Sequence, residues 1–432
     1  MAMMNSSVQC KRIHLNNALP LSTANYLDYV CWLSRHINDD IFDICYNHKV
    51  IMYDRAVLHL DLDSFFVSVE CLKNSSFLGK PLIIGGTSQR GVVASCSYEA
   101  RRFGVHSAMP IKMALRLCPD ALIIKGDYDS YSYYSKLVTE IIAEDAPLLE
   151  KASIDEFYLD LTGLDQYFGC FSWSKELRHR VIKESGLPIS FGLAVNKLVS
   201  KVGTGEGKPN GEKQVPKGTE KTFMAKLPVK KIPGVGKETH KKLSFMGVRL
   251  VKTLSQIPIR LLEREFGKHG KKLWEKANAI DNTPVVPYNE KKSISKEKTF
   301  TEDTLDLQMI RHRMMGMVDA LAYELRTSDK LTSCITIKIR YADFNTYTKQ
   351  RRISYTANDR SLIRYAYELF DNLYDRRQLI RLIGVKFSGL VNGHYQISLF
   401  DDSVKTINLL KERDQIRKRF GVDAISYAAS IG

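Results

Sequence analysis

Two short apolar stretches of the chain carry carboxylates where a buried strand would end. The segment Val57–Leu60 leads directly to Asp61, and the run Ser153–Leu161 holds Asp155 and Glu156 among apolar, β-prone residues. Charges in a buried strand are unfavourable unless another group compensates them. A divalent cation is the natural compensation, because hard ions such as Mg²⁺ bind carboxylate oxygens. The pattern therefore predicts two neighbouring strands that share metal between them.

The geometry of a strand restricts how these acids can meet. Adjacent side chains on a flat strand point to opposite faces, so Asp155 and Glu156 can share one site only at a bend or a strand end. A hairpin after Ala152 would provide that bend. Spacing alone does not choose between Asp61 and Asp63 as the partner from the first strand.

Either acidic group taken alone is equally well explained by salt-bridged or solvated residues at strand ends. Two such groups, each on an apolar strand, favour a two-metal site instead. Phosphoryl transfer uses such a site, with cations about 3.5–4 Å apart that clamp the attacking and leaving oxygens.

Beyond these strands the apolar pattern divides the chain. Strands and helices follow one another up to the strand Ile189–Val195, and from residue 197 the composition shifts to lysine, glycine and proline. This shift predicts a separate small helical domain with a basic face, followed by a linker over 289–297. Residues 298–391 then show the order β-α-β-β-α-β. In the strand Ser333–Tyr341 apolar positions alternate with Lys338 and Arg340, which predicts one packed face and one basic face.

The net charge and the composition indicate which kind of molecule the protein binds and where in the cell it works. The formal net charge is +16, so the surface attracts polyanions, nucleic acid first and acidic membrane second. No stretch approaches the ~18 apolar residues of a membrane span, and the start does not resemble a signal peptide. The eight cysteines include no Cys-x-x-Cys pair, which argues against a zinc site or a disulfide framework. We therefore expect a cytoplasmic protein without a membrane partner.

Three segments, in this order, resemble the motifs of the Y-family DNA polymerases, and most closely those of the DNA polymerase IV branch. They are His59–Glu70 (HLDLDSFFVSVE), Tyr98–Arg101 (YEAR) and Ser153–Asp160 (SIDEFYLD). The resemblance, over residues 56–402, implies a multidomain α+β fold shaped like a right hand. Its parts would be a ferredoxin-like palm (56–64 and 128–215), small fingers (65–127), a helical thumb with a helix-hairpin-helix (216–288) and a β-α-β-β-α-β little finger (298–395). Residues 1–55 would be an extension of unknown role, and 396–432 a clamp-binding peptide and tail.

The resemblance also assigns roles at the metal site. Asp61, Asp155 and Glu156 would be the catalytic ligands of two Mg²⁺ ions, and the backbone carbonyl of Leu62 would be a further ligand. Asp63 would then be structural.

The incoming nucleotide has its own set of implied contacts. Phe66 would be the steric gate, a ring beneath the sugar that leaves no room for a 2′-hydroxyl, whereas the residue alone suggests a core phenylalanine. Ser95, Tyr98, Arg101 and Lys208 would contact the triphosphate, since arginine offers a bidentate fork and tyrosine a directed hydroxyl. Without the resemblance, Arg101 is an exposed helical arginine and Lys208 one more lysine in a basic loop.

Contacts to DNA are expected in two places. Gly234, Gly236 and Lys237 look like a helix-hairpin-helix, whose glycines expose backbone N–H groups to a phosphate without sequence preference. The basic strand face with Lys338 and Arg340 would hold the duplex in the same backbone-directed way.

A short segment after the last strand resembles the bacterial sliding-clamp peptide. It runs from Gln396 to Phe400, with Leu399 and Phe400 as apolar anchors for a clamp pocket. The alternative is the frayed end of that strand. Unlike a terminal peptide, it is followed by about thirty residues, including the basic, helix-like segment Leu409–Phe420.

These observations predict a monomeric, template-directed DNA polymerase that adds dNTPs to a primer 3′-end by two-metal chemistry. Its partners would be primer-template DNA, dNTP and a bacterial sliding clamp. Small fingers imply a roomy site, so the resemblance suggests low-fidelity translesion synthesis in DNA repair, without proofreading. The first rival is a catalytically silent DNA- and clamp-binding protein on the same fold. The second is a helix-hairpin-helix nuclease or glycosylase, which leaves Phe66, Tyr98 and Arg101 unexplained.

Overall fold

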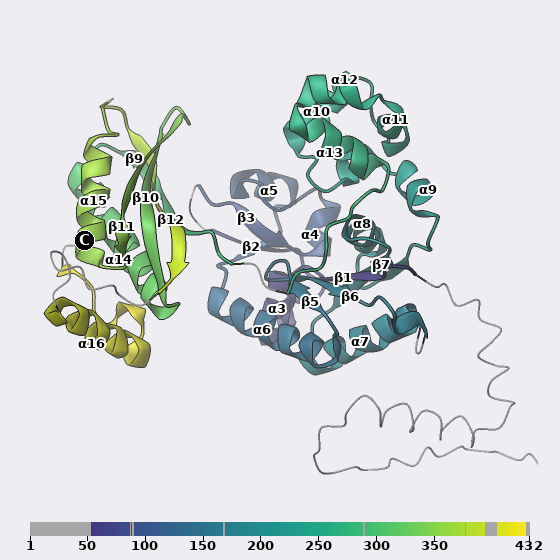
Figure 1. The fold of residues 1–432 in the computed structure, drawn as a ribbon, viewed down its shortest axis with the longest axis horizontal. Helices are drawn as coiled ribbons and strands as arrows, with labels where there is room; N and C mark the ends of the chain where they lie inside the picture. The colour runs from purple at the N-terminus through teal and green to yellow at the C-terminus, as the bar shows by residue number, and fades with distance from the viewer. Residues whose placement is uncertain are drawn as a thin grey trace, which may run out of the picture.

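The computed structural model describes residues 53–86, 88, 90–166, 169–287, 290–375, 377–393 and 404–428. Figure 1 shows two lobes joined by an extended segment, with a helical thumb on one side of the larger lobe. The fold is α+β with several domains arranged as in a right hand, as the sequence predicts.

The palm is a five-stranded sheet with helices on both faces. Its strand order is β5 (Leu149–Lys151), β6 (Glu156–Asp160), β1 (Val57–Leu62), β7 (Ile189–Ala194) and β8 (Glu212–Gln214). Leu58, Leu60 and Leu62 alternate along β1 and pack in one core with side chains of α6 (Tyr128–Asp145) and α7 (Cys170–Ser185). Helix α8 (Lys197–Gly207) lies on the opposite face, where the remaining side chains of β1 point (Figure 1).

The fingers form a small three-stranded sheet. Its order is β3 (Val93–Cys96), β2 (Leu82–Gly85) and β4 (Leu122–Ile124), with helices α4 (Tyr98–Arg102) and α5 (Ile111–Leu117) beside it. The run after Asp63 is a helix, α3 (Phe65–Lys73). Ser64 connects β1 to α3 with φ of +44°, so the chain turns sharply and places the start of the helix beside the end of β1.

The described part of the thumb is built mainly of short α-helices. They are α9 (Glu220–Ala225), α10 (Lys237–Phe245), α11 (Val251–Gln256), α12 (Ile259–Phe266) and α13 (Lys268–Ala277). They share a core with the apolar side of α8, including Leu198 and Val202, so the thumb is packed on the palm through that helix.

The little finger has the expected element order. The elements are β9 (Ser293–Thr304), α14 (Leu307–Thr327), β10 (Lys330–Tyr341), β11 (Thr346–Thr356), α15 (Asp359–Asp371) and β12 (Ile380–Asn392). The sheet order β11-β10-β12-β9 places one strand inside each β-α-β crossover, which is the split arrangement. Figure 1 shows α14 and α15 on the side of the sheet away from the palm.

The little finger differs from the sequence expectation at two places. Strand β9 begins at Ser293, inside the stretch 289–297 expected to be a linker, because Ser293 through Thr299 pair with β12. The tail helix α16 spans Val404–Phe420 and is longer than the segment Leu409–Phe420 expected to be helical. Within the described part of the chain, no helix combines the length and apolar character needed to cross a membrane.

Candidate active site

Pairing between β1 and β6 brings the expected carboxylates together. Asp61 lies directly opposite Glu156 in the antiparallel register. Asp155 precedes β6 in the turn of the β5–β6 hairpin, and its carbonyl accepts a hydrogen bond from the Leu62 N–H at 3.0 Å. The bend expected after Ala152 is therefore present, and it allows two consecutive acids to face one region.

A cavity of about 190 Å³ lies at this junction of palm and fingers. Residues expected at the metal and nucleotide sites that line it are Asp61, Leu62, Phe66, Ser95, Arg101, Asp155 and Lys208. Glu156 does not line it, but one of its carboxylate oxygens lies within 4.8 Å of one of Asp61. Segments far apart in the sequence thus converge on one hollow.

Lysines from α8 and its C-terminal end neutralise these acids. Lys201 Nζ lies 2.6 Å from both carboxylate oxygens of Glu156, and the Lys208 ammonium pairs with the Asp61 carboxylate. Burial raises the pKa of Asp61 to about 6 although Lys208 opposes the shift, while the nearby Asp155 and Glu156 add to it. Three carboxylates therefore lie close together in a partly buried site, where their negative charges are unfavourable unless positive groups lie beside them.

Asp63 has a different environment. Its side chain is 2% exposed and accepts hydrogen bonds from the Tyr98 hydroxyl at 3.1 Å and the Ser190 hydroxyl at 2.6 Å. The Asn210 backbone N–H donates to the same carboxylate at 2.7 Å. These donors use the carboxylate within the protein, so Asp63 ties the end of β1 to α4 and β7 as a structural acid.

The two phenylalanines after Ser64 have unequal surroundings. Both line the cavity, but Phe65 is otherwise buried in the palm core, whereas Phe66 is partly exposed. The Phe66 ring stacks on Tyr131 at 4.2 Å with an interplanar angle of 12°, and Tyr128 lies edge-on to it. Since Tyr131 is anchored by a 2.8 Å hydrogen bond to Glu70, the Phe66 ring has a rigid support.

Tyr98 and Arg101 lie on one short helix of the fingers. The Arg101 guanidinium stacks over the Tyr98 ring at 4.8 Å, and its Nε donates to the Cys96 carbonyl at 3.2 Å. These contacts orient Arg101 at the cavity wall. The Tyr98 hydroxyl is already bonded to Asp63, and Tyr98 is not among the residues that line the cavity.

Two residues near the carboxylates were not identified from the sequence. His59 is 1% exposed and lies on the same face of β1 as Asp61, two positions away, and Lys201 pairs with Glu156. Burial keeps the pKa of His59 well below its usual range, and the nearby lysines, including Lys201, add to that effect. A usable signal for Lys201 was present, because positions 197, 201, 204 and 208 repeat at helical spacing and three of them are lysines.

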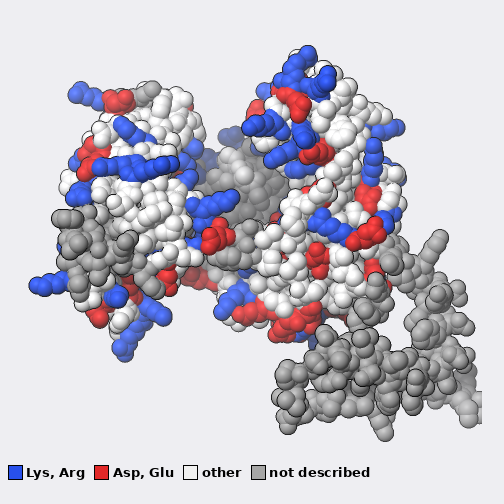
Figure 2. Space-filling view, in the orientation of Figure 1, with Lys and Arg blue, Asp and Glu red and all other residues white. Residues whose placement is uncertain are grey.

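The expected DNA contacts lie on two separate surfaces. Gly234 has φ of +91°, which glycine adopts readily, and Gly236 precedes α10, whose first residue is Lys237. On β10, Lys338 pairs with Glu297, and the Arg340 Nε donates to the Thr346 hydroxyl at 2.8 Å. Figure 2 shows Lys and Arg side chains on both lobes bordering the hollow between them.

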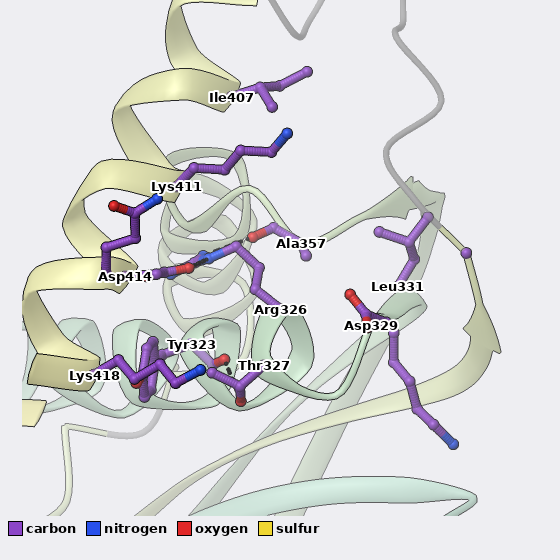
Figure 3. A pocket seen from close by; sticks show the side chains of 13 residues that line it. Tyr323, Arg326, Thr327, Asp329, Leu331, Ala357, Ile407, Lys411, Asp414 and Lys418 are labelled. Atoms are coloured by element: carbon purple, nitrogen blue, oxygen red, sulfur yellow. Dashed lines mark hydrogen bonds and ion pairs between the residues drawn. The ribbon is translucent and has the colours of Figure 1, made fainter.

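The clamp-peptide residues Gln396, Leu399 and Phe400 lie outside the described residues. The tail helix α16 that follows them packs on the little finger. A cavity of about 670 Å³ lies between the two, with Tyr323 and Leu331 on one side and Ile407 and Lys411 on the other (Figure 3). This cavity is remote from the palm carboxylates and contains no group expected to take part in their chemistry.

Comparison with known proteins agrees with this geometry. Residues 60–205 match the model of the impB/mucB/samB family, 291–399 match that family's C-terminal domain, and 230–281 match the DNA polymerase-iota thumb domain. The chain is 36% identical over 375 residues to a DNA polymerase IV of Dehalococcoides mccartyi, which covers 86% of this chain and 96% of that protein. It is 37% identical over 353 residues to a DNA polymerase IV of Streptococcus pyogenes serotype M1, covering 80% of this chain and 96% of the relative.

Solved structures of Y-family DNA polymerases also match the fold of this chain. A Y-family DNA polymerase chimera, Dbh-Dpo4(243-245)-Dbh, superposes with a TM-score of 0.71 at 26% identity and covers 78% of this chain and 99% of its own. An insertion ternary complex of Dbh DNA polymerase gives a TM-score of 0.57 at 26% identity, with the same two coverages.

Proposed function

The chain belongs to the impB/mucB/samB family of Y-family DNA polymerases, and on this premise we propose that it extends a primer 3′-end with dNTPs on a DNA template by two-metal phosphoryl transfer. The observation that carries the proposal is the β1–β6 register, with Asp61 opposite Glu156 and Asp155 in the adjoining turn. The rival without catalysis, a silent DNA- and clamp-binding protein, does not account for these acids.

The donor set suits hard divalent cations. Asp61, Asp155 and Glu156 offer carboxylate oxygens and Leu62 a backbone carbonyl, and the two lysine ammonium groups now beside the acids occupy positions that favour positive charge. These four residues would hold two Mg²⁺ ions. When bound, the ions would activate the primer hydroxyl and neutralise charge on the leaving pyrophosphate.

The protein's own residues would orient the nucleotide. Arg101, fixed by its contacts to Tyr98 and Cys96, would direct its guanidinium to the triphosphate, with Ser95 beside it in the cavity wall. Once cations neutralise Asp61, the Lys208 ammonium would be released to a phosphate oxygen. The Tyr98 hydroxyl would reach a phosphate only by exchanging its bond to Asp63.

Primer extension by the purified chain tests the proposal. With Mg²⁺, primed template and four dNTPs, we expect products elongated one nucleotide at a time, and none in EDTA. The rival predicts a gel shift of the same DNA without any elongation. Elongation that persists in an Asp155→Asn, Glu156→Gln double variant would contradict the assigned ligands.

Sugar selection provides a separate prediction at Phe66. Because its ring is supported by Tyr131 at the cavity, Phe66→Ala should open space for a 2′-hydroxyl and raise ribonucleotide incorporation by roughly a hundredfold, since one removed clash of this kind changes discrimination by a few kcal/mol. Single-nucleotide insertion of rCTP against dCTP measures it. Phe191→Leu is the matched control, since that ring lies in the palm core and does not line the cavity. Unchanged sugar selection in Phe66→Ala would reject the gate assignment.

The remaining parts of the proposal concern DNA and partners. Phosphate contacts from Gly234, Gly236 and Lys237 in the thumb, and from Lys338 and Arg340 in the little finger, would hold the duplex on both sides of the hollow in Figure 2. The small three-stranded fingers support low-fidelity translesion synthesis, which extension past an abasic site would measure.

We also propose that the protein is a cytoplasmic monomer that binds a bacterial sliding clamp through Gln396, Leu399 and Phe400. A Leu399→Ala, Phe400→Ala variant should lose retention on an immobilised clamp while extending short primers normally. Sedimentation would measure the oligomeric state.

A further inference from the structure

The fingers and the little finger contact each other away from the chain segment that joins the two lobes. Along the chain, the little finger follows the thumb through the segment that leads into β9 (Figure 1). Arg90, in the turn between β2 and β3 of the fingers, nevertheless reaches β9. Its two acceptors there, Phe300 and Asp303, lie 210 and 213 positions away in the sequence. The lobes therefore have a second point of attachment.

This contact combines an ion pair with a hydrogen bond to the backbone. Arg90 Nη1 donates to Asp303 Oδ1 at 2.6 Å and to the Phe300 carbonyl at 3.0 Å. The side chains of Arg90 and Asp303 are only 23% and 19% exposed, so solvent and salt screen their charges less than those of a typical surface pair. Two acceptors for one guanidinium fix its orientation as well as its distance.

An irregularity in β9 presents both acceptors to the fingers. The pairing of β9 with β12 contains a bulge, in which residues 300–303 of β9 lie opposite Arg381 alone. A bulge takes residues out of the regular ladder and changes the direction of their side chains. Arg381 Nη1 lies 3.9 Å from the Asp303 oxygen that Arg90 contacts, so an arginine from each lobe borders this carboxylate.

We propose that this interlobe ion pair, Arg90–Asp303, sets the orientation of the little finger relative to the fingers before DNA binds. A connecting segment limits the distance between two domains, whereas a second attachment also restricts their relative rotation. The inference rests on the proposed function, because its consequence concerns DNA held between the lobes. Arg90 acts through the little finger and is therefore a positioning residue.

The consequence is tighter binding of primer-template DNA. Basic side chains border the hollow from both lobes, and a duplex must contact both sets at once (Figure 2). Lobes that are already oriented lose less freedom on binding, so more of the contact free energy appears as affinity. Arg90 is not among the residues that line the cavity at the palm carboxylates, so the insertion step itself should not depend on it.

A double-mutant cycle in the full-length chain tests the pair. Arg90→Met and Asp303→Ala should each weaken the affinity for primer-template DNA by roughly three- to tenfold, measured by fluorescence anisotropy. The double variant should lose no more than either single variant, because both changes remove the same interaction. Insertion of one nucleotide at saturating DNA and dNTP should keep its rate.

Two further variants separate positioning from a general effect of charge. Arg90→Lys keeps a cation beside Asp303 and should retain more of the affinity than Arg90→Met. Arg116→Met removes the same charge from an exposed position on α5 of the fingers, for which the described ranges show no ion pair, and should leave the affinity nearly unchanged.

Small-angle X-ray scattering of the DNA-free chain measures the orientation directly. Loss of the interlobe ion pair in Arg90→Met should broaden the distribution of interatomic distances, and the Arg116→Met curve should match that of the unaltered chain. An unchanged curve for Arg90→Met would overturn the inference, and so would tighter DNA binding, which would mean that the contact obstructs the hollow. Losses of affinity that multiply in the double variant would overturn it as well, because the two residues would then act independently.

These outcomes are distinct from a failure of the proposed function. If the unaltered chain does not elongate a primer but Arg90→Met still broadens the scattering distances, the polymerase proposal fails and the role of the pair stands. If the chain elongates primers and the scattering does not respond to Arg90→Met, the inference fails and the polymerase proposal stands.

Discussion

At the palm cavity and under the tail helix, acidic side chains are paired with basic ones, but the pairs in these two regions are built differently. In the palm, Asp61 and Glu156 face Lys208 and Lys201 beside an open cavity, and both lysine side chains remain between a fifth and a third exposed. Lysine is a hydrated point charge on a flexible stem, so it can exchange one partner for another at a small cost in free energy.

Under the tail helix the partners are arginines. Arg417 contacts Asp319 through two nitrogens, at 2.6 and 3.2 Å, and both side chains are almost fully buried. Arg413 pairs with the fully buried Asp359 and lies 3.3 Å from Asp319. These contacts, bidentate at Arg417, fasten α16 to α14 and α15.

The difference teaches how to tell a functional acid from a structural one. Acids paired with lysines at a cavity can be transferred to an incoming cation, because the lysine can move into water or onto a phosphate. Acids held by buried arginines have no such exchange, since breaking one pair leaves an uncompensated buried charge. Removing an acid should therefore affect activity in the palm and stability in the tail.

The largest expected effect is on activity, at Asp61. Asp61→Asn should lower the rate of primer extension by roughly 10³-fold or more, because loss of a metal ligand removes several kcal/mol of transition-state stabilisation. The fold should persist, since the amide can still accept a hydrogen bond from Lys208. Single-turnover nucleotide insertion gives the rate, and circular dichroism checks the fold.

Asp63→Asn, two residues further along the chain and just after β1, is the matched comparison. Asp63 is held by Tyr98, Ser190 and Asn210, so its replacement should reduce stability more than Asp61→Asn does and reduce the chemical step less. Equal losses of activity in the two variants, with equal stability, would break the distinction between the acids.

The expected effect at Arg417 is on stability. Arg417→Met leaves Asp319 buried without its main partner, so the docking of α16 should weaken by up to about 3–5 kcal/mol. Amide hydrogen exchange in α16 should accelerate, while extension of a simple primed template stays unchanged because the tail is remote from the palm.

Replacing both partners tests the cause of that loss. An Arg417→Met, Asp319→Leu double variant removes the stranded charge and should recover much of the protection in α16. If the double variant exchanges as fast as Arg417→Met, the arginine acts through packing on Tyr323 and not through the ion pair.

The elements predicted from the sequence are those whose signal is local. Asp155 and Glu156 stand out because charges interrupt an apolar strand, and the β-α-β-β-α-β order follows from alternation within each strand. Strand β9 was started too late because Ser293–Lys298 has too few apolar residues, and only pairing with β12 makes it a strand.

Longer-range partnerships were missed for a related reason. The pair Arg417–Asp319 joins residues 98 positions apart, and the sequence around neither residue indicates its partner. His59 acquires its setting only when β1, β6 and α8 are assembled, since its contacts are Tyr158 and Thr204. The motifs located the site, whereas its electrostatic surroundings depended on tertiary packing.

The smallest effect is the pH dependence that burial of Asp61 gives the metal-free palm. The pKa of Asp61 is raised from 3.8 to about 6, so between these values the folded protein keeps a proton that the unfolded chain has lost. The free energy of unfolding should therefore fall as pH rises through this window, by about 3 kcal/mol in total. Asp61→Asn cannot titrate, so its stability relative to the unaltered protein should increase from pH 4 to pH 7.5. Hydrogen exchange of β1 and β6 amides in EDTA measures this locally. A stability difference that stays constant over this range would mean that burial does not oppose the charge of Asp61. The charged form of Asp61 would then be as well compensated in the metal-free protein as the acids paired with arginines beneath the tail helix.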